Sequence, residues 1–147
     1  FSRDFARVYR AEKTKRELLE ILHKKLRAIV DAMFDGMVAI NEELIVLDVN
    51  KTFERMFQIK QEDICGYPLK KILPYPDIIR NIKNMHALNK HFQSMELHFR
   101  RDREHYFETN ISRIRGSREE PRGYVLLFQD MTDRMRFDRI KSRFITF

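Results

Sequence analysis

The sequence has little of what marks secreted or membrane-spanning proteins. It has 147 residues and a single cysteine, Cys65, which cannot form an internal disulfide and is typical of a protein in a reducing compartment. No apolar run approaches the roughly 18 residues that a membrane-spanning helix needs, and no signal peptide is expected. The length is that of one domain with a helical extension. We therefore expect a soluble cytoplasmic domain, attached to the inner membrane, if at all, by other parts of its parent protein.

The common motifs of nucleotide and metal chemistry are also missing. There is no phosphate-binding loop of the G-x-x-x-x-G-K type, no G-x-G-x-x-G and no H-E-x-x-H. None of the five histidines lies at a spacing typical of a zinc site; they are His23, His86, His91, His98 and His105. We expect no catalytic residue and no metal in this chain.

The net charge of +7 is concentrated at the two ends of the sequence. Residues 1–30 carry nine Lys/Arg against four Asp/Glu, and residues 131–147 carry five against two. The intervening body is nearly neutral, whereas a nucleic-acid-binding domain normally has its basic surface on the folded body. The pattern favours solvated helix faces over a nucleic-acid interface. Basic residues near a membrane span of the parent protein are a second interpretation.

Residues 3–33 contain neither glycine nor proline and predict one long helix. Their apolar residues follow a 3-4-3-4 spacing, with Glu12 and Lys15 in the same register. This spacing is typical of a coiled-coil seam, although an amphipathic helix packed on its own domain would share it. The apolar positions are Phe5, Val8, Leu19, Leu22, Leu26, Ile29 and Met33. We expect residues 1–30 to form a coiled-coil linker in a homodimer.

The first half of the body predicts two strands followed by short helices. Asp35 and Gly36 are expected to end the long helix, before strands over 37–40 and 44–49. Asn50 is a candidate N-cap for a short helix. Two single helical turns follow, the first ending at Gly66 in a left-handed conformation. Asp77 is then a candidate cap for a longer helix.

The second half changes to the period of two that is typical of strands. In QSMELHFR, Met95, Leu97 and Phe99 alternate with polar residues, and EHYFETNISRIR predicts a second strand after a charged turn. Tyr124–Phe128 is apolar on both faces, so both faces should be covered, one of them by the second half of the long helix. The order predicts an α+β fold with a five-stranded antiparallel sheet, short helices on one face and a coiled-coil-like helix at each end.

The last strand is followed without a loop by a predicted helix start. Asp130 and Thr132 are both good N-cap residues, and Asp130 and Asp133 have the spacing of a capping box. Arg134 follows Asp130 at the distance of an ion pair along a helix. These four residues are either a stable helix start or a joint through which strand movement displaces the helix.

The order of elements and the sequence GYVLLFQDMTDR resemble a PAS domain over residues 28–133. The resemblance implies that Asp130, Thr132, Asp133 and Arg134 relay a signal from the sheet to an output helix. It also implies a small-ligand pocket between the sheet and the short helices, although the same side chains would make an ordinary filled core. The expected walls are Phe57, Ile72, Ile79, Ile82, Met95, Leu97, Phe107, Ile111 and Leu127.

No cofactor is evident from the resemblance, although an unknown small ligand is compatible with it. Flavin is not expected, because Leu69 occupies the position where flavin-binding relatives have their reactive cysteine. Haem is not expected either, because His86 does not match the ligand motif of haem-binding relatives.

Residues 131–147 continue a helical seam through Phe137, Ile140, Phe144 and Phe147. FDRIKSRFITF resembles the stretch before the phosphoacceptor histidine of bacterial two-component sensor histidine kinases. We therefore expect a linker over 1–30, a PAS sensor over 31–130 and an output helix over 131–147 that leads into a dimerisation and phosphoacceptor bundle. The parent would be an ATP-dependent, autophosphorylating kinase. Another output, such as a cyclic-dinucleotide enzyme or transcription factor, or a dimerisation spacer that binds no ligand, remains an alternative.

Overall fold

The computed structural model describes residues 2–116 and 122–133. The chain divides into two compact units, residues 1–33 and residues 34–147. The first unit contains the helix α1 (Ser2–Ala32), and the described residues of the second contain five strands, four shorter helices and the start of a helix at Thr132. The predicted fold class, α+β with a five-stranded antiparallel sheet, is confirmed.

Helix α1 is continuous over 31 residues, in agreement with the absence of glycine and proline. An ion pair of 3.2 Å joins Arg27 to Asp31 one turn later along the helix. The apolar residues of the predicted seam are exposed on α1, except Met33, which follows its last residue; those on α1 are Phe5, Val8, Leu19, Leu22, Leu26 and Ile29. No helix among the described residues is long and apolar enough to cross a bilayer.

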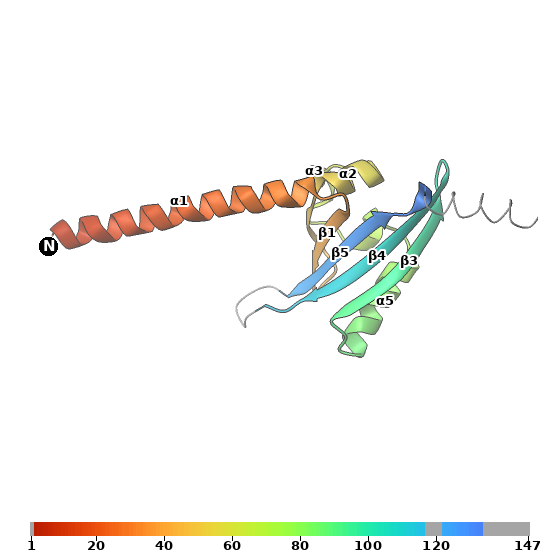
Figure 1. Ribbon diagram of the computed structural model, residues 1–147. Coiled ribbons are helices and arrows are strands. Elements are labelled where there is room, and N and C mark those ends of the chain that lie inside the picture. Colours follow the sequence, from red (N-terminus) through yellow and green to blue (C-terminus); the bar gives the residue numbers. More distant parts are fainter. Residues whose placement is uncertain (1, 117–121, 134–147) are drawn as a thin grey trace, which may run out of the picture. The chain divides into compact units, whose positions relative to one another are not determined.

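The strands are β1 (Gly36–Asn41), β2 (Val46–Val49), β3 (Phe92–Arg100), β4 (Glu104–Ile114) and β5 (Gly123–Asp130). Their order in the sheet is β2-β1-β5-β4-β3, and every neighbouring pair is antiparallel. Figure 1 shows the part of the sheet that runs from β1 through β5 and β4 to β3. The last strand in the sequence is therefore the middle strand of the sheet. It pairs with β1 on one side and β4 on the other, so sheet formation requires residues more than 80 positions apart to meet.

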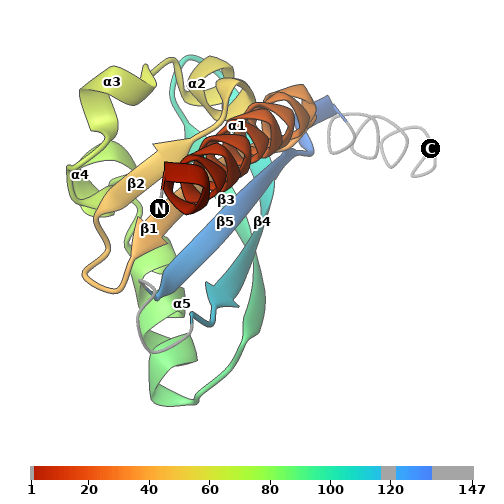
Figure 2. The same ribbon diagram turned by 90° about the vertical axis from the view of Figure 1, so that its left-hand side faces the viewer.

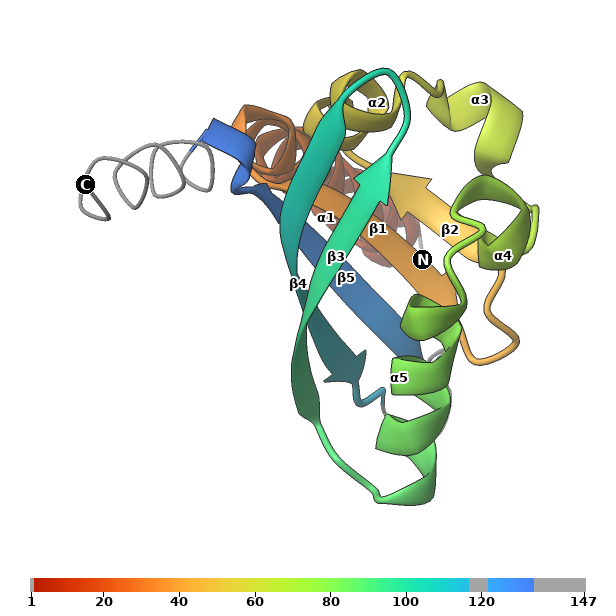
Figure 3. The same ribbon diagram turned by 90° about the vertical axis from the view of Figure 1, so that its right-hand side faces the viewer.

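The short helices are α2 (Lys51–Phe57), α3 (Gln61–Ile64), α4 (Leu69–Ile72) and α5 (Pro76–Ala87). Figures 2 and 3 show them in succession between β2 and β3. Each contributes buried apolar side chains to one core with the inward face of the sheet. Four buried phenylalanines lie at its centre, Phe53, Phe57, Phe107 and Phe128, and the partly buried Phe99 packs against Phe57 and Phe107. Neighbouring ring centroids are 4.6–6.5 Å apart.

Asn50 links the start of the sheet to the first short helix. Its Oδ1 accepts hydrogen bonds of 2.9 Å from the backbone N–H groups of Met37 and Phe53. Its amide nitrogen donates to the carbonyl of Asp35, also at 2.9 Å. The predicted N-cap of α2 is thus confirmed, and this fully buried side chain also fixes the strand that begins at Gly36.

Two predicted helix boundaries are wrong. Helix α1 ends at Ala32, and Gly36 lies in β1, where an added Cβ would come within 2.9 Å of the Met56 sulfur. The added Cβ would also lie 3.2 Å from the Phe53 Cα, so Gly36 allows the close approach of α2 to β1 and does not form a left-handed turn. Helix α5 begins with Pro76 after Tyr75, so Asp77 lies in its first turn and does not cap it. The left-handed conformation predicted at Gly66 is confirmed, with φ of +90°.

Replacing Asn50 with Ala should lower the free energy of unfolding by about 3 kcal/mol. The change removes a helix cap and leaves the N–H of Met37 without its acceptor inside the protein. Asn84→Ala, on the exposed side of α5, is the matched control and should change stability by less than about 0.5 kcal/mol. Urea denaturation measures both, and equal effects of the two substitutions would contradict this role of Asn50.

The core contains one hydroxyl group without a partner. Thr109 lies on the inward face of β4 with no exposed surface, and its Oγ1 has no hydrogen-bond partner among the described residues. A buried hydroxyl that makes no hydrogen bond destabilises the folded state.

Thr109→Val should therefore raise the free energy of unfolding by about 1 kcal/mol, because the isosteric methyl group needs no partner. Thr52→Val is the control, since the buried Thr52 hydroxyl accepts a hydrogen bond of 3.2 Å from Arg55 and its loss should bring no gain. A loss of stability in Thr109→Val would mean that water or a ligand occupies the core beside this hydroxyl.

Candidate functional site

The chain leaves the middle of the sheet through a short hydrogen-bonded junction. Strand β5 ends at Asp130, and Thr132 and Asp133 are already helical, so a single residue, Met131, separates strand from helix. The predicted passage from strand to helix without a loop is confirmed as far as Asp133. Asp130 Oδ1 accepts a hydrogen bond of 2.9 Å from the N–H of Thr132, which fixes the first turn after the strand.

Strand β4 holds this junction from the side. The N–H of Met131 donates to the carbonyl of Tyr106 over 2.7 Å. In return, the N–H of Tyr106 donates to Oγ1 of Thr132 over 3.1 Å. Thr132 is buried, at 3% exposure, although it lies beyond the last strand. The β4–β5 ladder is therefore extended past β5 by a side chain, and the residues after the sheet are attached to two strands.

The junction differs in detail from the sequence-based interpretation. The Thr132 hydroxyl accepts a hydrogen bond from β4, and the N–H groups that it was predicted to cap lie outside the described residues. Asp133 is exposed, and a capping-box bond from it is not among the hydrogen bonds of the described residues. Arg134 lies outside the described residues, so its ion pair with Asp130 stays a prediction, as does the relay role of all four residues.

Most of the predicted pocket walls meet in the core. Phe57, Ile82, Leu97, Phe107 and Ile111 are at most 4% exposed and belong to one apolar cluster. The remaining walls on the same face pack against this cluster while partly exposed; they are Ile72, Ile79 and Met95.

Leu127 does not join the other predicted walls. Side chains alternate along a strand, and Leu126 and Phe128 occupy the inward positions of β5, so Leu127 faces the other side of the sheet. There it is paired with Met37 of β1. The predicted walls without Leu127 are thus one packed core that also contains the Thr109 hydroxyl.

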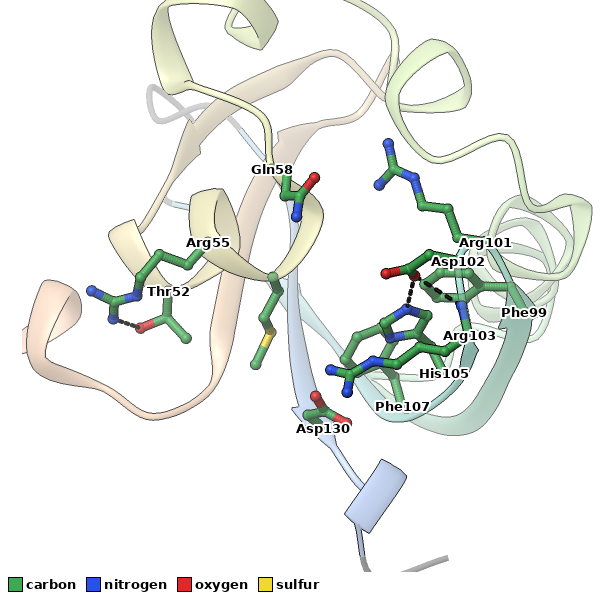
Figure 4. A pocket seen from close by; sticks show the side chains of 11 residues that line it. Thr52, Arg55, Gln58, Phe99, Arg101, Asp102, Arg103, His105, Phe107 and Asp130 are labelled. Carbon is green, nitrogen blue, oxygen red and sulfur yellow. Dashed lines mark hydrogen bonds and ion pairs between the residues drawn. The ribbon is translucent and has the colours of Figure 1, made fainter. Parts of the chain in front are cut away.

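A groove of about 560 Å³ lies beside the junction, between α2, the β3–β4 turn and the end of β5 (Figure 4). Its apolar wall is formed by Met56, Phe99 and Phe107, with the His105 ring stacked 5.0 Å from Phe99. Its polar lining consists of Thr52, Arg55, Gln58, Arg101, Asp102, Arg103, His105 and Asp130. The groove therefore adjoins the junction directly, because Asp130 belongs to both.

The charged groups of the turn are only partly engaged. Nε2 of His105 lies 3.1 Å from a carboxylate oxygen of Asp102, and this hydrogen bond is the main reason that the pKa of Asp102 lies below its ordinary value. Arg101 donates to the carbonyl of Phe57 over 3.2 Å, at the C-terminal end of α2. Burial raises the pKa of the Tyr75 hydroxyl, and the charge of Arg101 partly offsets this.

Sequence analysis missed Tyr106, Arg101 and Arg103. Tyr106 acts through its backbone groups, which no side-chain motif reveals. A signal was present in the charged turn RRDR, which had been read only as a connection between two strands. Because β4 and β5 are antiparallel neighbours, the start of β4 must lie beside the end of β5, and this brings the turn to the junction.

Comparison with known proteins supports the fold and the family. A family model described as the PAS fold matches residues 24–131. The hybrid signal transduction histidine kinase E of Dictyostelium discoideum is 38% identical over 56 residues, which are 38% of this chain and 3% of that protein. The chain thus spans only a small part of this relative.

Solved structures of similar fold include several sensor domains. The PAS domain of a protein from Colwellia psychrerythraea has a TM-score of 0.62 at 20% identity, covering 77% of this chain and 98% of that one. An RNA-binding light-oxygen-voltage receptor has a TM-score of 0.67 at 15% identity, covering 87% of this chain and 38% of that one. A PAS domain from a two-component sensor histidine kinase has a TM-score of 0.55 at 15% identity, covering 76% of this chain and 97% of that one. With the family match over most of its length, the chain belongs to the PAS family.

Proposed function

We propose that this chain is the signal-sensing and relay domain of a sensor histidine kinase, in which changes in the sheet reach a C-terminal helix through Asp130 and Thr132. The observation that carries the proposal is the pair of hydrogen bonds between the Tyr106 backbone and the residues that follow β5. The domain itself is not catalytic. A histidine kinase output is supported by the Dictyostelium relative and by the PAS domain of a two-component kinase.

The relay mechanism follows from the position of the junction. Thr132 is bonded to β4, and Asp130 ends β5, so a shift between these two strands changes the direction in which the chain leaves the sheet. A signal from a ligand or an upstream domain would shift the population between two packings of the output helix. A flexible loop would absorb such a shift, whereas one residue between strand and helix transmits it.

The same domain could control a different output. The RNA-binding light-oxygen-voltage receptor resembles this chain in fold, which indicates that such a domain is compatible with an output other than a kinase. A cyclic-dinucleotide enzyme or a transcription factor is therefore the second candidate. The sequence that follows residue 147 in the parent gene would distinguish them, since a kinase requires its phosphoacceptor histidine within the next turns.

We also propose that α1 pairs with a second copy of the chain. Its apolar residues at 3-4 spacing are 46–75% exposed, and burying them between two helices would stabilise a dimer. For a dimerisation spacer, this pairing of two α1 helices would be the whole function, whereas a sensor also needs a ligand or an upstream signal. Attachment to the inner membrane would come from other parts of the parent protein.

Replacing both Asp130 and Thr132 with Ala should uncouple signal from output in the full-length parent. The variant loses the bond from the Thr132 N–H to Asp130 and the bond from the Tyr106 N–H to Thr132, which should lower the free energy of unfolding by about 2 kcal/mol and leave the sheet folded. Autophosphorylation should be measured under several growth conditions, and in this variant it should no longer change with the condition. Gln129→Ala, at an exposed position of β5 next to Asp130, is the control and should respond as the wild type does. An unchanged response in the double variant would refute the relay.

Native mass spectrometry should detect the 147-residue chain as a dimer. Leu22→Lys places a charge in the proposed seam of both copies and should weaken the dimer at least about 100-fold. Ile21→Lys is the matched control, because Ile21 is similarly exposed but lies off the seam. Equal dimer populations in the two variants would exclude this seam. A small molecule retained from expression would appear as added mass and favour a sensor over a spacer.

A further inference from the structure

We infer that the groove beside the junction is a binding site for a small molecule that carries a carboxylate or phosphate on an apolar body. The groove is separate from the predicted pocket inside the core, with which it shares only Phe107. Its volume of about 560 Å³ is in the range of small-molecule sites. The site itself does not depend on the proposed relay, but any effect of its ligand on output does.

The choice of an anion follows from the hydrogen-bonding capacity that the protein leaves unused. Three arginines line the groove, and an arginine offers five N–H donors. Arg55 donates to Thr52 and Arg101 to Phe57, while the side chain of Arg103 makes no hydrogen bond or ion pair to the described part of the chain. Most of the guanidinium donors are thus available for an acceptor.

The acidic groups of the groove are engaged within the protein instead. Asp102 accepts from His105 and from the N–H of Arg103, and Asp130 accepts from the N–H of Thr132. Three arginines outnumber these two carboxylates in the lining, so the charge of the groove favours an anion over a positively charged ligand. A carboxylate or phosphate would instead receive the short, charge-assisted hydrogen bonds that guanidinium groups form best.

The position of the arginines favours binding at the centre of the groove. Figure 4 shows Arg103 extending across the groove beside His105, in the direction of Asp130, whereas Arg55 turns toward Thr52. Arg103 is therefore the principal ligand-binding side chain, with Arg101 at the rim. The apolar wall of Met56, Phe99 and Phe107 accounts for the apolar body of the ligand.

The test titrates four probes into the 147-residue protein and detects binding by the changes in amide chemical shifts in NMR spectra. Benzoate and phenyl phosphate carry a charged group on an apolar ring, benzyl alcohol has the ring without charge, and inorganic phosphate has charge without the ring. We expect benzoate or phenyl phosphate to shift the amides of Arg101 and Arg103 saturably. The tighter of these two probes shows whether the site prefers a carboxylate or a phosphate. Benzyl alcohol and inorganic phosphate should bind at least about ten-fold more weakly.

Matched substitutions assign the binding to the groove. Arg103→Gln should weaken the better probe at least about ten-fold, whereas Arg100→Gln, at the exposed end of β3, should change its Kd less than about two-fold. Thr109→Val should also leave the Kd unchanged, because Thr109 lies in the core. The inference is overturned if neither charged probe binds saturably, if benzyl alcohol binds equally well, or if Arg103→Gln behaves like Arg100→Gln. Binding to the groove without any change in autophosphorylation of the parent protein would confirm the site and show that its ligand does not control the output, whereas the relay itself is tested separately by the Asp130 and Thr132 double variant.

Discussion

The structure depends on one constraint: the last strand of the sequence is the middle strand of the sheet. Strand β5 must pair with β1 on one side and with β4 on the other before the core can close. At Gly123 the backbone of β1 comes so near that an added Cβ would lie 2.0 Å from the Ile40 carbonyl oxygen. The chain after residue 130 is therefore attached to the centre of the domain, where displacements of either half of the sheet meet.

The core, the junction and the groove are connected through this strand and its neighbour β4. Phe107 is buried among the core phenylalanines and also lines the groove, and Tyr106 beside it binds the residues after β5. Interiors packed in this way respond to a perturbation by changing between discrete arrangements rather than by deforming gradually. A ligand in the groove would thus act on the junction at contact distance, whereas a ligand in the core would act through the packing of β4.

Sequence patterns predicted the parts of the fold that local chemistry determines. Alternation in QSMELHFR, the Asn50 cap and the left-handed Gly66 follow from the residues themselves and are confirmed. Gly36 was misread because its requirement comes from Phe53 and Met56, which only the folded chain brings close. Leu127 was misplaced because a strand that is apolar on both faces does not indicate which face is inward. The groove was not predicted, because the charged turn RRDR shows its role only when the antiparallel pairing of β4 and β5 places it beside the end of β5.

Met131 and Thr132 follow β5 and are held by the sheet through hydrogen bonds to β4. Amide hydrogen exchange measured by NMR tests this most directly at Tyr106, Met131 and Thr132, whose N–H groups make the three hydrogen bonds of the junction. These amides should be protected to within about ten-fold of Leu126 in the middle of β5, since they should open together with the sheet. Exchange at nearly the rate of an unstructured peptide, while Leu126 remains protected, would show that the chain beyond the sheet is not held by it and would contradict the account.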